Sequence, residues 1–118
     1  MNKRVFVIVL IVLTSVILSW VNGFFYRFNI ITAKCDIANN NLYYVHVGDL
    51  IVYPIEMNKI SKKYGFKNIS YGCTVSEFEL NGIEDYNDEL IEFLNIKNGL
   101  DWKNKYNKDL DSLINLYK

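Results

Sequence analysis

The chain has little of what metal and catalytic sites require: its 118 residues include one histidine, one proline and two cysteines. A zinc site needs several Cys or His ligands at characteristic spacings, and His46 stands in no such pattern. Phosphate-binding glycine loops, serine elbows and calcium loops are also missing. We therefore expect no metal, no cofactor and no catalytic residue. A small hydrolase-type enzyme is the weakest alternative.

Charge is absent from Val5 to Tyr26, a run of 22 residues that directly follows Lys3 and Arg4. Valine, isoleucine and leucine dominate this run. As a helix it reaches roughly 33 Å, enough to cross the ~30 Å hydrocarbon layer. Residues 5–26 are therefore expected to contact a membrane. Because positive residues resist translocation, we expect a cytoplasmic N-terminus and an extracytoplasmic remainder, either periplasmic or on the cell surface.

Two interpretations of this segment stay open. In the first, residues 1–27 are an uncleaved transmembrane signal anchor for a small extracytoplasmic domain over residues 28–118. In the second, they are a signal peptide, and a secreted or periplasmic protein is released after Gly23, because Val21-Asn22-Gly23 resembles a cleavage site. The apolar core of 17 residues exceeds the length of about 7–15 that is typical of signal peptides, which favours the anchor.

An excess of basic residues is missing from the expected domain. From Phe28 onward there are 10 Lys and Arg against 13 Asp and Glu, a net charge of −3. Proteins that bind nucleic acid need a basic patch, so we expect no nucleic-acid partner. Roughly 90 residues also make a small domain with a marginal core.

Cys35 and Cys73 both fall in the part expected outside the cytoplasm. Two thiols in a small exported domain often pair, so we expect a disulfide between them, with two free thiols as the alternative. In the chain-entropy model, closing a loop of this length stabilises a protein by about 3–4 kcal/mol.

Turn and capping residues divide the expected domain into alternating elements. Pro54 suits the start of a short helix and Gly65 its end, while Asn81 with Glu84 forms a capping pattern. Runs rich in tyrosine and β-branched residues before and after that short helix predict strands. We expect an α+β fold with two strands and three to four helices, after the N-terminal transmembrane helix. The expected helices cover 28–39, 55–64, 81–98 and 102–117, and the expected strands 42–53 and 66–76. The last helix is expected because apolar residues, among them Trp102 and Tyr106, recur there at helical spacing.

Four acidic residues share one face of the helix expected over 81–98. Asp85, Asp88, Glu89 and Glu92 stand at positions i, i+3, i+4 and i+7, which places them on a single convex surface. A glycosidase-type pair would instead lie across a cleft. We expect a solvated face or a docking face for a basic protein partner.

A complementary basic cluster surrounds the short helix: Lys59, Lys62, Lys63 and Lys67. Such lysines increase solubility, and they can also contact anionic lipid headgroups. The sequence as a whole predicts a membrane-anchored extracytoplasmic binding or accessory module that acts through contacts with an unidentified protein partner. Its specific ligand and oligomeric state are not indicated by any motif.

Overall fold

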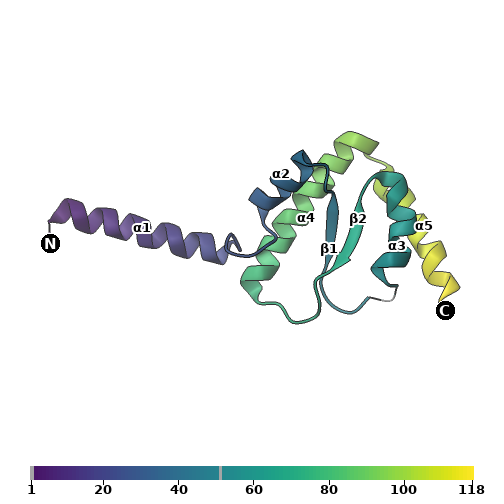
Figure 1. Cartoon of the computed structure of the whole chain (residues 1–118), viewed down its shortest axis with the longest axis horizontal. Coiled ribbons are helices and arrows are strands. Elements are labelled where there is room, and N and C mark those ends of the chain that lie inside the picture. Colours follow the sequence, from purple (N-terminus) through teal and green to yellow (C-terminus); the bar gives the residue numbers. More distant parts are fainter. Residues whose placement is uncertain (1, 51) are drawn as a thin grey trace.

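The computed structural model describes residues 2–50 and 52–118. In these residues a long N-terminal helix leads into a small α+β domain with a two-stranded parallel sheet, as expected (Figure 1). The elements in chain order are α1 (Lys3–Val21), α2 (Ile30–Ala38), β1 (Tyr43–His46), α3 (Pro54–Ser61), the 3₁₀ turn η1 (Lys62–Tyr64), β2 (Lys67–Ser70), α4 (Glu77–Asn98) and α5 (Trp102–Leu116).

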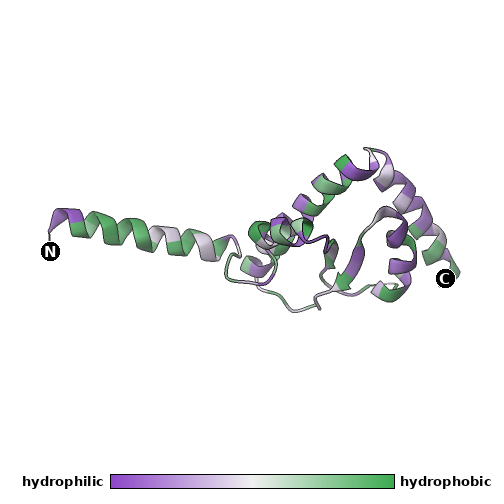
Figure 2. Ribbon diagram, turned by 45° about the horizontal axis from the view of Figure 1, so that its top comes forward, coloured by the Kyte–Doolittle hydropathy of each residue, from purple (hydrophilic) through white to green (hydrophobic). Residues whose placement is uncertain are grey.

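Helix α1 projects away from the domain and has no buried side chain. Its hydroxyl groups are satisfied within the helix, since Thr14 donates to the carbonyl of Leu10 at 2.8 Å and Ser15 to that of Ile11 at 2.8 Å. Its surface is almost entirely apolar along its length (Figure 2). By length and composition α1 therefore fits a membrane span or a signal sequence.

The two strands pair in parallel, with Tyr43 opposite Lys67 and His46 opposite Ser70. A parallel pair requires a crossover, and α3 supplies it between β1 and β2. Each strand has four residues and is shorter than predicted. The pairing ends near Gly48, whose φ of +95° turns the chain away. Beyond it the loop before Pro54 leads into α3.

Helix α4 contributes buried residues to both hydrophobic clusters of the domain. Leu90 and Leu94 belong to the cluster that includes Trp102 and Tyr106 of α5. One to two turns earlier, Ile83 and Tyr86 pack with the second cluster, whose other buried members are Phe28, Ala33 and Val45. A single long helix thus joins the C-terminal half of the domain to the segment that follows α1.

The predicted boundaries hold for some helices and fail for others. Pro54 begins α3 as expected, and Gly65, with φ of +86°, ends the 3₁₀ turn. The prediction that Asn81 caps a helix is wrong. Helix α4 begins four residues earlier, where the Ser76 hydroxyl accepts from the Glu79 backbone N–H at 3.2 Å. The alternating pattern over 71–76 suggested a longer strand, but these residues form the loop before α4.

Candidate functional site

The junction between α1 and the domain is closely packed. Gly23 is buried and has a φ of +74°. A Cβ placed on it would lie 2.6 Å from the carbonyl oxygen of Phe78 and 2.8 Å from Cα of Gly82, both in α4. Only glycine permits this backbone approach, so the end of the apolar segment rests directly on the first turns of α4.

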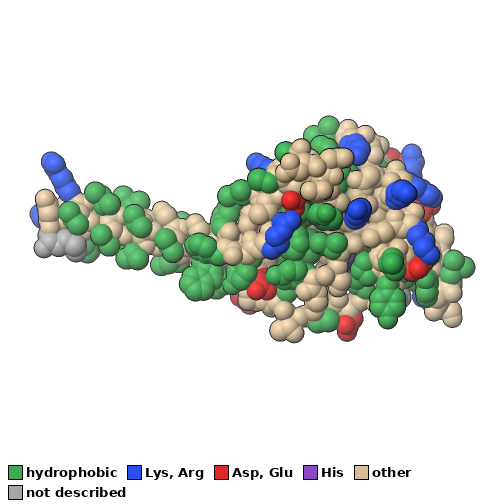
Figure 3. Space-filling view, viewed as in Figure 1, with side chains coloured by type: hydrophobic (Ala, Val, Ile, Leu, Met, Phe, Trp, Pro, Cys, Tyr) green, Lys and Arg blue, Asp and Glu red, His purple; other side chains and the backbone are tan. Residues whose placement is uncertain are grey.

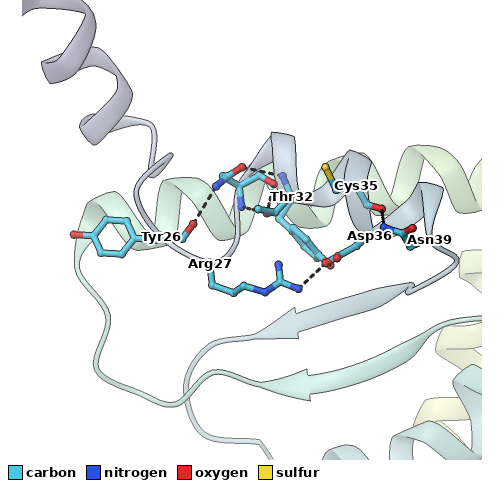
Figure 4. Close-up of polar contacts among 8 residues, drawn as sticks. Tyr26, Arg27, Thr32, Cys35, Asp36 and Asn39 are labelled. Atoms are coloured by element: carbon cyan, nitrogen blue, oxygen red, sulfur yellow. Dashed lines mark hydrogen bonds and ion pairs between the residues drawn. The ribbon is translucent and has the colours of Figure 1, made fainter.

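Two asparagine side chains hold the same junction. The Asn81 amide donates to the carbonyl of Val21, the last residue of α1, at 2.9 Å. Asn29 is buried and caps α2: its Oδ1 accepts from the backbone N–H of Thr32, and its amide donates to the carbonyl of Tyr26 at 3.0 Å (Figure 4). These bonds satisfy backbone groups at the end of α1, in the first turn of α2 and in the segment between the two helices.

The first charge after the apolar run is also attached to the domain. Arg27 donates to Oδ2 of Asp36 at 2.8 Å (Figure 4). Its guanidinium also lies 4.8 Å from the ring centroid of Phe28. The Tyr86 hydroxyl donates to the same oxygen at 2.6 Å. Burial, followed by this hydrogen bond, raises the pKa of Tyr86 well above its ordinary value. The hydrogen bond to Asp36 also raises the pKa of Arg27.

Exposed aromatic rings surround the junction. Trp20 and Phe25 meet edge to face with centroids 6.4 Å apart, and both are more than half exposed. Phe78 at the start of α4 is also partly exposed. Aromatic rings favour the interface between hydrocarbon and water, so their position suits one end of a membrane span.

The predicted acidic face lies on α4. Asp85, Asp88 and Glu92 are exposed and Glu89 is half-buried, and none of the four forms an ion pair within the described residues. Their carboxylates are thus available to solvent or to a basic partner. The docking role stays a prediction.

The four predicted headgroup lysines lie at the end of the domain remote from α1, on α3, η1 and β2 (Figures 1 and 3). Lys59 pairs with Glu56 at 2.7 Å and Lys63 with Asp109 at 3.5 Å. Lys62 and Lys67 line a groove of about 460 Å³. This placement does not favour contact with the membrane that α1 would cross, and headgroup binding stays a prediction.

The expected disulfide is absent: Cys35 and Cys73 are both exposed, free thiols. Cys35 precedes β1 and Cys73 follows β2. Cys35 is held on α2, which packs against α4, whereas Cys73 lies in the loop between β2 and α4. The Cys73 thiol instead donates to the Asp49 carboxylate at 3.1 Å, a bond that raises the pKa of this thiol.

A cleft that the sequence analysis missed lies between β1 and α5. It has a volume of about 180 Å³, and Tyr44, His46, Asn68, Trp102 and Tyr106 are among the residues that line it. His46, which stands in no metal-ligand pattern in the sequence, reaches the buried Asn68 there at 2.8 Å. The helical spacing of Trp102 and Tyr106 was the one available signal, and it indicated a core face.

Searches for related proteins do not add to this description: no family model matches the chain, and neither a curated protein nor a solved structure is significantly similar to it. The fold and the junction therefore define the protein only as a small α+β domain that carries an apolar N-terminal helix.

Proposed function

We propose that the protein is a membrane-anchored, extracytoplasmic binding module that acts through contacts with a protein partner. The observation that carries this proposal is the contrast between the exposed side chains of α1 and its packed C-terminal end. Its side chains are entirely unburied, while its C-terminal end is attached to α4 through Gly23 and Asn81. Apolar side chains that are exposed along a whole helix are unfavourable in water and favourable in the hydrocarbon of a membrane.

The packing at Gly23 favours a retained anchor over a cleaved signal peptide. Cleavage after Gly23 would remove the hydrogen bond between Asn81 and Val21 and the backbone contact with Gly82. It would leave a charged terminus at Phe24 beside the buried surface of α4. The folded domain therefore uses residues that a cleaved signal peptide would discard.

The acidic face supports a basic partner. Asp85, Asp88 and Glu92 project from α4 without ion pairs within residues 2–50 and 52–118, and the junction holds α4 close to the outer end of α1. Unpaired surface carboxylates of one sign increase the association rate of a positively charged protein.

The N-terminus of the mature protein tests the anchor. The protein is purified from membranes and its intact mass is measured. Retention of residues 1–23 is the expected result, and a chain beginning at Phe24 in the medium would contradict the proposal. The double variant Val21→Ala, Gly23→Ala creates a small-x-small cleavage motif and is the positive control for release.

Thiol labelling tests the orientation. A membrane-impermeant maleimide added to intact cells is expected to label Cys35 and Cys73, because both are exposed. An Asn2→Cys variant that lacks both natural cysteines is the control, and it is expected to react only after lysis. Labelling of Asn2→Cys in intact cells would reverse the proposed topology.

Site-specific photocrosslinking in native membranes tests the acidic face. A photoreactive residue at Asp88 is expected to form a discrete adduct, which is weakened by combined Asp85→Asn and Glu92→Gln substitutions. The same residue at Ser112, on the exposed surface of α5, is the matched control. Equal adducts at both positions, or none at Asp88, would overturn the partner proposal.

A further inference from the structure

The cleft between β1 and α5 has buried aromatic walls. Phe66, Trp102 and Tyr106, which line it, are 4%, 5% and 8% exposed. Lys103 and Asn107 of α5 also line the cleft and are exposed, so they mark its opening. An apolar interior with a few polar groups at one side is typical of small-molecule sites.

The polar groups of the cleft are not all paired. Asn68 accepts from Nε2 of His46 at 2.8 Å and donates to the Tyr106 hydroxyl at 3.4 Å. The Tyr106 oxygen is thus an acceptor, and its own proton has no acceptor within the described residues. Because a buried donor without a partner is costly, this phenol is available to bind an oxygen atom of a ligand.

The volume restricts the ligand to one ring. About 180 Å³ is close to the ~150 Å³ of a protein cavity that accommodates benzene. It is below the ~300 Å³ at which sites for drug-sized molecules begin.

The charges at the opening favour an anion on the α5 side. The Lys103 ammonium forms no ion pair in the described part of the chain, and the Asn107 side chain adds an amide group. On the β1 side of the cleft, burial and then the negative charge of Asp88 raise the pKa of Tyr44. A second negative charge is therefore disfavoured near β1. An anionic group is therefore expected next to Lys103 and the Tyr106 hydroxyl.

We propose that this cleft binds a small aromatic carboxylate, with its ring against the wall formed by Phe66 and Trp102 and its carboxylate at Lys103 and Tyr106. The ligand site takes no contact from the carboxylates of the acidic face on α4, and it does not depend on the anchored topology. Benzoate is the simplest molecule of this class and serves as the probe.

The test is an NMR titration of the full-length protein in lipid nanodiscs. The chain has two tryptophans, so it gives two indole N–H signals, and a Trp20→Phe variant assigns them. The Trp102 signal is expected to shift with benzoate and to saturate with a Kd of about 1 mM, as is usual for so small a ligand. The Trp20 signal, from α1, is the internal control and is expected to stay in place.

Three variants and one further probe separate a built site from general adsorption. Lys103→Gln and Tyr106→Phe are each expected to weaken benzoate binding about 3- to 10-fold. Lys105→Gln removes the same charge from a neighbouring lysine, which pairs with Asp101, and is expected to leave the Kd unchanged. Acetate, which lacks the ring, is expected to cause no saturable shift.

Several outcomes would overturn the proposal. These are a Trp102 signal that does not move at about ten times the expected Kd, an equal response to acetate, and equal losses in Lys103→Gln and Lys105→Gln. A failed membrane anchor would instead appear in the N-terminal mass and would leave the titration unaffected.

Discussion

Gly23 and Gly82 lie backbone to backbone where α1 meets α4. A Cβ on Gly82 would be 3.2 Å from the carbonyl oxygen of Gly23 and 3.3 Å from its Cα, and it would collide with the carbonyl oxygen of Phe28. The contact joins two residues that are far apart in the chain, and it attaches the apolar helix to the domain through main-chain atoms.

Substitution of Gly82 is therefore expected to reverse the usual effect of alanine in a helix. In a helix interior, glycine-to-alanine normally stabilises by about 0.5–1 kcal/mol. Here Gly82→Ala is expected to lower the free energy of unfolding by about 1–3 kcal/mol, because the added methyl group overpacks the junction. Denaturant unfolding in nanodiscs measures this change, and limited proteolysis of residues 22–29 reports the loosened junction.

Glu84→Ala, on the exposed side of the same helix turn, is the control. It is expected to change the free energy of unfolding by less than about 0.5 kcal/mol. A stabilised Gly82→Ala protein with an unchanged proteolysis pattern would show that the two backbones are not in contact.

Tyr86→Phe is expected to reduce stability by about 1–2 kcal/mol near neutral pH, because Asp36 loses one of its two hydrogen-bond donors. The pKa of Tyr86 is raised above 10 in the folded state, so its contribution is present below about pH 10 and is lost as the pH rises further. The difference in stability between wild type and Tyr86→Phe should therefore narrow as the pH rises above about 10.

Unfolding curves of both proteins at several pH values measure this difference. Burial also raises the pKa of other tyrosines, which titrate in wild type and variant alike and cancel in the comparison: Tyr44, Tyr64 and Tyr106. A difference that does not change with pH would contradict the shift at Tyr86.

Alkylation without reductant is expected to label both cysteines, and Cys35 is expected to react faster than Cys73. The thiolate is the reactive form, and the bond to Asp49 raises the pKa of the Cys73 thiol. Asp49→Asn should accelerate labelling of Cys73 and leave Cys35 unchanged, as peptide mass spectrometry over time would show. Recovery of a Cys35–Cys73 disulfide from freshly isolated protein would contradict the structure.

Asn68→Ala is expected to lower the free energy of unfolding by about 1–3 kcal/mol. The substitution removes the buried acceptor for His46 and the donor to Tyr106. Urea unfolding measures the loss. Asn107→Ala at the exposed opening of the same cleft is the matched control and should stay within about 0.5 kcal/mol of wild type. Equal effects of the two substitutions would exclude a structural role for the Asn68 network.

Local sequence signals predicted the elements that local chemistry controls. The uncharged run predicted α1, Pro54 and Gly65 bounded the α3 region, and apolar residues at helical spacing predicted α5. The start of α4 was misplaced because Ser76 and Asn81 are both good capping residues. The packing of Gly82 against Gly23 requires the helix to extend through Asn81, and a local pattern does not contain that information.

The sequence by itself therefore determined that an apolar helix precedes a small acidic α+β domain, because charge, hydropathy and turn residues act over short distances. Tertiary structure decided that Cys35 and Cys73 stay apart and that Gly23 touches Gly82. It also created the cleft beside Tyr106. Each of these features depends on how helices and strands that are distant in the sequence pack together: α2 and α1 against α4, and α5 against the sheet.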